Sequence, residues 1–178
     1  MQQNFFMTMK GSSKGDVTSK ANTSDSDETH AVDAYKGKAT VLWYKEEAQI
    51  ERGTSGQVTG TPVYIPVEVA GLGGTALESS VRDLFDTGEQ LSEVTIERYR
   101  LKKEGGKDNH YKHTYKNGVI TGFKSMFGST PEDLMTGTTP GMQREVQEIL
   151  LIQFTFETAD HEALKSSVQA SVNKNQGS

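Results

Sequence analysis

A long alternation of apolar and polar residues near the C-terminus constrains the fold of this chain more than any other feature. Within the segment Arg144–Thr158, the apolar residues at alternate positions are Val146, Leu150, Ile152, Phe154 and Phe156. The positions between them are mostly polar, with Ile149 and Leu151 as apolar exceptions. A period of two over this length is typical of a long β-strand with one side in a core. Together with a second strand-like run from Leu91 to Phe127, it predicts a β-rich protein with few helices.

Length and composition exclude several classes of protein. The 178 residues suffice for one domain with a proper core but hardly for two. The absence of cysteine excludes disulfides, thiolate metal sites and thiol nucleophiles. A net charge of -5 provides no general attraction to nucleic acid or acidic membranes. The N-terminal residues lack the features of a signal peptide, and no segment approaches the roughly 18 apolar residues that span a bilayer. We therefore expect a protein made in the cytoplasm, without membrane insertion and without a cleaved signal peptide.

Other strands follow from local composition. Pro66 cannot donate to a β-ladder, so the strand around it lies at an edge or is broken there. Residues 46–60 are polar and form either a long loop or a pair of weak strands. The pair Asn117–Gly118 is typical of a tight hairpin turn, but it is also compatible with a bulge within one long strand. Besides the strands in the two long runs, three segments have strand composition: Asn4–Lys10, Lys38–Lys45 and Pro62–Val69.

One helix is predicted over Thr75–Asp86. Thr75 is a candidate N-cap, and Glu78 stands three residues later, which is the pattern of a capping box. Gly88 provides a stop at the C-terminal end. Its apolar stripe consists of Leu77, Val81, Leu84 and Phe85. The opposite face of the helix is charged, so we expect the helix to cover one open side of a larger body.

The remaining segments are predicted to be loops or a tail. Polar residues 11–30 and 129–142 are expected to form mobile loops, with a single helical turn beginning at Ser129. The main domain is therefore assigned to residues 1–160. Residues 161–178 are assigned to a partly disordered C-terminal tail, in which His161–Val172 has weak helical spacing.

A glycine-rich turn offers one enzymatic alternative. The segment Gly71–Ala76 follows a predicted strand, precedes the predicted helix and fits the G-x-G-x-x-[GA] pattern of dinucleotide-binding turns. That pattern requires a βαβ unit in a parallel sheet, and this chain has one convincing helix. A flexible connector with a Thr cap is the simpler interpretation, and a nucleotide-binding enzyme is the alternative.

A basic stretch offers a second alternative. Lysines and arginines interleave with tyrosines between Arg98 and Lys116, a pattern found in proteins that bind single-stranded nucleic acid. Proteins of this kind are usually strongly basic, whereas this chain is acidic. We therefore favour a solvent-facing hairpin whose lysines prevent incorrect strand pairing, and expect no nucleic-acid partner.

No catalytic, cofactor-binding or metal site is predicted. His110 and His113 lie three apart on a strand and project to opposite faces, while His30 and His161 have polar neighbours in the sequence. Trp43 lies in an apolar strand and is most simply a core residue. The carboxylate pairs Asp83 with Asp86 and Glu145 with Glu148 each fit a solvated face as well as a site.

The order of these pieces resembles the hemolysin-coregulated protein (Hcp) family, the tube protein of type VI secretion systems. The resemblance extends over residues 4–158. It rests on the order and spacing of the predicted strands and on the single helix rather than on one motif. The matching segments are Phe5–Gly11, Pro62–Val69, the helix end Phe85–Gly88, Val94–Tyr99, Tyr111–Tyr115, Gly118–Ser125 and Gln143–Phe156. The enlarged segment 129–142 departs from the family's usual pattern, as do residues 11–38 and those after the closing strand.

The resemblance implies a mainly β fold: a small barrel of two packed β-sheets with one flanking α-helix. It implies a structural subunit without catalytic activity or cofactor, which forms homohexameric rings that stack into a hollow tube. A contractile sheath would expel this tube together with a spike protein and effectors, so the chain would be secreted. Phage tail tubes share the architecture, and a related contractile injection tube is a further alternative.

Overall fold

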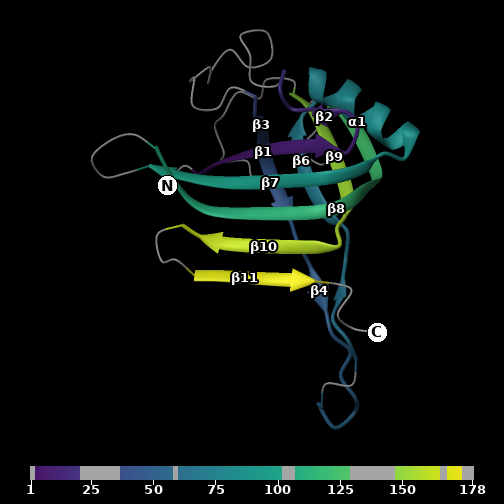
Figure 1. Cartoon of the computed structure of the whole chain (residues 1–178), viewed down its shortest axis with the longest axis vertical. Coiled ribbons are helices and arrows are strands. Elements are labelled where there is room, and N and C mark those ends of the chain that lie inside the picture. The colour runs from purple at the N-terminus through teal and green to yellow at the C-terminus, as the bar shows by residue number, and fades with distance from the viewer. Residues whose placement is uncertain are drawn as a thin grey trace.

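The computed structural model describes residues 3–20, 37–57, 60–101, 107–128, 147–164 and 168–173. Within these ranges the chain forms eleven strands and one helix (Figure 1). No helix in these ranges is long and apolar enough to cross a membrane. The elements are β1 (Gln3–Gly11), β2 (Gly15–Asp16), β3 (Ala39–Lys45), β4 (Ala48–Gln49), β5 (Val63–Tyr64), β6 (Val67–Leu72), α1 (Ala76–Thr87), β7 (Gln90–Leu101), β8 (Lys107–Gly128), β9 (Gln147–Thr155), β10 (Thr158–Ala163) and β11 (Val168–Asn173).

Six of the strands close into an antiparallel barrel in the order β8-β7-β1-β3-β6-β9, with β9 returning to β8. Closure depends on the 22-residue strand β8. Its residues 107–119 pair with β7, and its residues 119–128 pair with β9. One strand thus joins the two halves of the sheet, and the barrel strands are paired on both sides. The β-rich fold predicted from the sequence and the small barrel implied by the family resemblance are both confirmed.

Strand β8 passes through Asn117–Gly118 without turning back. Asn117 has a positive φ of 54°, and a side chain at Gly118 would overlap the carbonyl oxygen of Thr155. The interpretation as part of one long strand is therefore confirmed, and the hairpin interpretation is wrong. The shift of register lies slightly further along, between Ile120 and Gly122.

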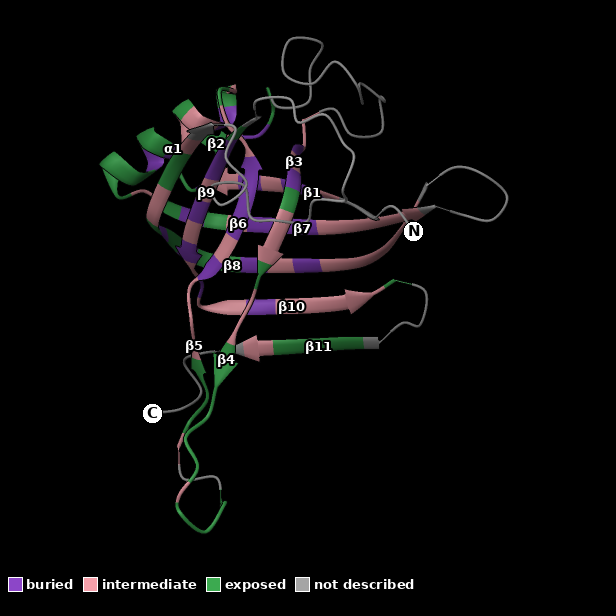
Figure 2. Ribbon diagram, turned by 180° about the vertical axis from the view of Figure 1, so that it is seen from behind, coloured by how far each residue is buried: buried purple, intermediate pink, exposed green. Residues whose placement is uncertain are grey.

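The barrel interior holds the core. The apolar face predicted for the closing strand is confirmed from Leu150 onward, because Leu150, Ile152, Phe154 and Phe156 are all at most 3% exposed, while Val146 lies outside the described residues. They pack with Met7 and Met9 of β1, Val94 and Ile96 of β7, and Tyr115 of β8. Figure 2 shows this burial concentrated in the strands that surround the barrel axis.

Helix α1 covers one end of the barrel beside β8 (Figure 1). Leu77, Val81 and Leu84 are buried as predicted, whereas Phe85 is 41% exposed and meets Phe123 edge-on. Gly88 adopts the left-handed conformation and ends the helix as predicted.

The predicted capping box is wrong. Thr75 occupies the N-cap position, but its side chain makes no cap hydrogen bond and instead donates to the carbonyl of Leu72, 3.2 Å away. The Glu78 carboxylate accepts from the backbone N–H of Gly74 at 2.9 Å. It also accepts from the Ser125 hydroxyl at 2.5 Å and from Arg82. These hydrogen bonds, the Ser125 one foremost, lower the pKa of Glu78 to about 2.

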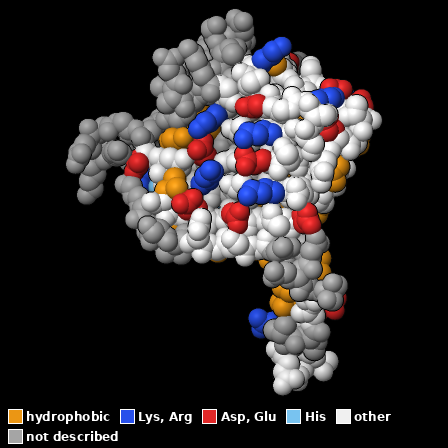
Figure 3. All heavy atoms as spheres, in the orientation of Figure 1, with side chains coloured by type: hydrophobic (Ala, Val, Ile, Leu, Met, Phe, Trp, Pro, Cys, Tyr) orange, Lys and Arg blue, Asp and Glu red, His pale blue; other side chains and the backbone are white. Residues whose placement is uncertain are grey.

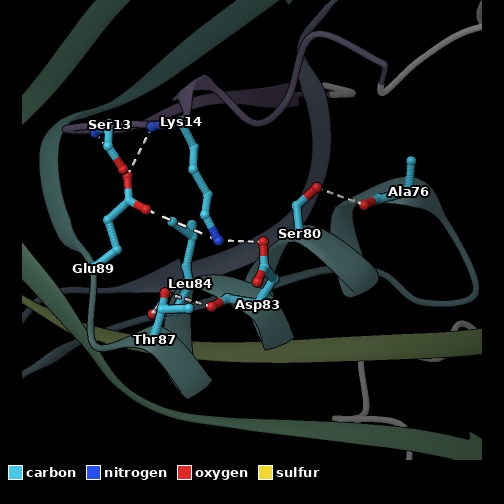
Figure 4. A network of polar contacts seen from close by, with 8 residues as sticks. All are labelled: Ser13, Lys14, Ala76, Ser80, Asp83, Leu84, Thr87 and Glu89. Atoms are coloured by element: carbon cyan, nitrogen blue, oxygen red, sulfur yellow. Dashed lines mark hydrogen bonds and ion pairs between the residues drawn. The ribbon is translucent and has the colours of Figure 1, made fainter.

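Polar contacts attach the C-terminal end of α1 to the turn between β1 and β2 (Figure 4). The Glu89 carboxylate accepts the backbone N–H groups of Ser13 at 2.8 Å and Lys14 at 2.9 Å. The Lys14 ammonium pairs with Asp83 on the helix. Asp83, one of the candidate paired carboxylates, is therefore part of a structural ion pair.

The helical interpretation of His161–Val172 is wrong. Strand β10 pairs with β8, and β11 pairs with β10, so this segment extends the sheet beyond the barrel. Of its apolar residues, Val172 packs against the core opposite the buried Ala159, whereas Leu164 is 38% exposed. The boundary proposed between residues 160 and 161 falls inside β10.

Residues 46–57 and 60–66 form a projection, called the arm below, that leaves the barrel between β3 and β6 (Figure 1). Within it, β4 and β5 pair only with each other. Of the pair of weak strands considered for residues 46–60, only β4 forms there, and its partner β5 belongs to the predicted strand Pro62–Val69. Pro66 separates β5 from β6, so the predicted strand is broken there. The predicted loop 129–142, the helical turn at Ser129 and residues 21–30 of the first polar loop lie outside the described residues.

Candidate functional site

An open groove of about 670 Å³ lies where β3 leaves the barrel toward the arm. Its lining includes Phe5 of β1, Trp43 and Tyr44 of β3, and Arg98 of β7. Trp43 is only partly buried, so its assignment to the core is wrong. The reason is that the pairing of β1 with β3 ends at Val41, and Trp43 therefore lies beyond it.

Two histidines and a glutamate meet beside this groove, and we call Glu46, His113 and His161 the His–Glu cluster. His113 of β8 and His161 of β10 are direct cross-strand neighbours, with their Nδ1 atoms 2.6 Å apart. Glu46 follows β3, and its carboxylate lies 3.8 Å from Nδ1 of His113 and 3.4 Å from Nε2 of His161. The side chains of His113 and His161 are only 7% and 14% exposed.

Two tyrosines surround the His–Glu cluster with further hydrogen bonds. The Tyr115 hydroxyl donates to the Glu46 carboxylate at 2.7 Å. The Tyr44 hydroxyl oxygen lies 2.6 Å from Nε2 of His113, and Arg98 Nε donates to the same oxygen at 3.1 Å. The Arg98 guanidinium also stacks over the Tyr44 and Tyr111 rings, which holds it against the groove.

Burial and neighbouring charge determine the protonation of this site. Burial lowers the pKa of His113 to about 4, and its neighbours His161 and Arg98 act in the same direction. His113 is therefore a neutral imidazole at neutral pH. Burial opposes the ionisation of Glu46, but hydrogen bonds from His161 and Tyr115 outweigh it and lower the pKa of that carboxyl. Burial raises the pKa of Tyr115, which stays protonated as a donor.

Sequence reasoning missed the His–Glu cluster. His110 takes no part in it, in agreement with the prediction that His110 and His113 do not act together. His113 instead meets His161, 48 residues away, through a strand pair that the sequence did not indicate. Recognising period two in residues 158–163 would have been the available signal, since it makes β10 a candidate neighbour of β8. His30 and Glu145 lie outside the described residues.

The glycine-rich turn is not built as a nucleotide site. Strand β6 runs antiparallel to both of its neighbours, so the parallel βαβ unit is missing around this turn. The N–H of Gly73 donates to the Glu148 carbonyl and that of Gly74 to the Glu78 carboxylate. Two acidic residues therefore occupy the place where a pyrophosphate would bind.

The basic stretch lies on a face of mixed charge. Figure 3 shows basic and acidic side chains alternating over the strands β1, β7, β8 and β10. Lys116 of the stretch pairs with Asp160 at 3.7 Å, and on the same face Lys10 pairs with Glu93 at 2.8 Å and Lys38 with Glu97 at 2.5 Å. Lys102 and Lys103 of the stretch lie outside the described residues. A surface of paired charges lacks the uniform positive potential of a nucleic-acid interface, which favours the solvent-facing interpretation.

Comparisons with known proteins point to one group. No protein-family profile matches the chain. A major exported protein of Pseudomonas aeruginosa is 28% identical over 120 residues, which make up 67% of this chain and 69% of that protein. Among solved structures, an Hcp protein superposes with a TM-score of 0.81 at 16% identity, covering 97% of this chain and 99% of the other. The secreted protein Hcp3 from Pseudomonas aeruginosa has a TM-score of 0.76 at 17% identity, covering 97% and 98%.

A type six secretion system protein has the same fold at lower similarity. Its TM-score is 0.57 at 10% identity, and the alignment covers 95% of this chain and all of the other. In each of these structures the match extends over nearly the whole of both chains, so the barrel, the helix and the C-terminal strands belong to one shared fold.

Proposed function

We propose that this chain, an Hcp protein by its fold and by its sequence likeness to an exported protein, is a subunit of the inner tube of a type VI secretion system. Six copies form a ring, and rings stack into a hollow tube. A contractile sheath expels the tube, which carries a spike protein and effectors. The chain is made in the cytoplasm and leaves the cell with the tube, without a cleaved signal peptide.

The observation that carries the proposal is the agreement of fold over almost the entire chain. The resemblance to the Hcp family predicted from residues 4–158 is confirmed by both the sequence relative and the solved structures. The match includes the strands β10 and β11, which the sequence did not predict. The role proposed for this chain needs no catalytic step, and the alternative of a nucleotide-binding enzyme is not favoured.

The arm supports self-assembly. It carries two exposed apolar side chains, Val63 at 60% and Ile50 at 37% exposure. An isolated two-stranded ribbon is marginally stable at best in water. Contact of the arm with another copy would bury these side chains and provide the missing support.

A second surface is available for the same purpose. Strand β11 ends the sheet, and its outer edge has no partner among the described residues. A closed ring of identical subunits joins two different surfaces of each copy head to tail. The arm and the β11 side are two such surfaces on one molecule, and the edge of β11 could be covered by a neighbour in the ring.

Light scattering after size exclusion, combined with negative-stain electron microscopy, tests the proposal. We expect a mass near six chains and ring-shaped particles. A protein that stays monomeric at high concentration and forms no rings would contradict it.

A substitution on the arm tests the mode of assembly. Val63→Asp places a charge on the exposed apolar surface and is expected to reduce ring formation and stacking, whereas Val63→Thr keeps the shape and serves as the matched control. Since Val63 is exposed, neither change should unfold the barrel, which circular dichroism would verify. Equal assembly by both variants would show that the arm is not an interface.

A further inference from the structure

The His–Glu cluster combines ligands that suit transition metals. Imidazole nitrogen and carboxylate oxygen together are typical of zinc sites, whereas magnesium and calcium prefer sites built from oxygen alone. Glu46, His113 and His161 each offer one ligand atom, and these atoms all lie within 4.8 Å of one another. The three residues come from different parts of the chain and converge on one point beside the groove.

The spacing is close to that of a tetrahedral ion. Bonds of about 2.0–2.2 Å to zinc place neighbouring ligand atoms roughly 3.3 Å apart. The Glu46 carboxylate lies 3.8 Å from Nδ1 of His113 and 3.4 Å from Nε2 of His161, and both separations are near this value. The 2.6 Å contact with His113 uses the other nitrogen of His161, Nδ1, so the His161 ring has to turn for one of its nitrogens to share an ion with both partners.

The surrounding hydrogen bonds orient the ligands as in metal sites. In the tautomer whose Nε2–H donates to the Tyr44 oxygen, His113 presents the lone pair of Nδ1 to the centre of the cluster, and an ion would select this tautomer. The Tyr115 hydroxyl holds the Glu46 carboxylate in the same way. Arg98 opposes a cation by its charge, but its hydrogen bonds go to the Tyr44 oxygen rather than to a ligand atom, and the Glu46 carboxylate offsets it.

We propose that Glu46, His113 and His161 bind a divalent transition-metal ion, for which zinc is the best fit. The groove lined by Glu46 and His113 provides the entry path and room for a water molecule as fourth ligand. The ion joins the end of β3, where the arm begins, to β8 and β10. It therefore fixes the base of the arm to the sheet.

Zinc titration of the full chain without a histidine tag tests this proposal. The protein is stripped with a chelator, dialysed, and titrated with zinc chloride in a calorimeter, with magnesium chloride as the comparison. We expect one zinc ion per chain and no magnesium binding. Cobalt should give the visible absorption of a tetrahedral site. Failure of the stripped protein to take up zinc in a one-to-one ratio overturns the proposal.

Variants identify the ligands. His161→Asn and His113→Gln should each weaken zinc binding by more than about tenfold. His110→Asn, on the same strand but outside the cluster, is the matched control and should bind as the unchanged chain does. If burial of His113 prevents its variant from folding, Glu46→Gln takes its place, since that side chain is 20% exposed. Unchanged affinity in His161→Asn and in the second folded variant shows that the ion binds elsewhere and overturns the proposal.

Discussion

Leu84 is the residue through which α1 should contribute most clearly to stability. Its side chain is 1% exposed, and one of its methyl groups faces Gly11 of β1. Leu84→Ala removes three buried carbons, worth about 0.8 kcal/mol each by transfer alone. The cavity left behind adds to this, so we expect a loss of about 3–5 kcal/mol. Because alanine is at least as good a helix former as leucine, the loss reports packing rather than helix propensity.

The neighbouring residue Phe85 provides the matched control. It is 41% exposed, and its ring meets Phe123 edge-on with centroids 5.4 Å apart. Such an aromatic pair is worth about 0.5–1.5 kcal/mol beyond its buried area, so Phe85→Ala should cost less than the change at Leu84. Urea unfolding of both variants at one protein concentration measures the difference, since assembly makes stability depend on concentration. Equal losses, or a loss below about 1 kcal/mol for Leu84→Ala, would refute the packing of this stripe on the barrel.

Two further predictions follow from the strand closure and from the helix start. Gly118→Ala should lower stability by about 1–3 kcal/mol, because its methyl group would overlap the backbone carbonyl of Thr155 and displace β9 from β8. Gly122→Ala on the same strand meets only the end of a side chain and should cost much less in thermal unfolding. The pKa of the Glu78 carboxyl is lowered to about 2. The ionised carboxylate therefore stabilises the folded chain fully above pH 4.5, and this contribution is lost as the pH falls toward 2. Glu78→Gln should reduce the change in the free energy of unfolding over this pH range.

Each of these predictions has a contradicting result. Equal melting temperatures for Gly118→Ala and Gly122→Ala would mean that β8 and β9 are not closely paired at Gly118. An unchanged slope of stability against pH between 4.5 and 2 in Glu78→Gln would mean that other carboxyl groups carry the acid sensitivity of this fold.

Local signals in the sequence predicted the elements whose structure depends on neighbours along the chain. The stripe of α1 and the stop at Gly88 follow from a period of 3.6 residues and from the tolerance of glycine for positive φ. The buried face of β9 follows from its period of two. The capping box failed because a local pattern cannot reveal that the Thr75 hydroxyl finds the Leu72 carbonyl and that Ser125 competes for Glu78.

The sequence by itself determined a β-rich chain with one amphipathic helix and a strand order that resembles the Hcp family. Only the tertiary structure decided that β8 pairs first with β7 and then with β9, and that β10 continues the sheet. It also decided that His113 and His161 meet beside Glu46. The physical reason is that strand partners and register are set by non-local packing, which no period within a single segment encodes.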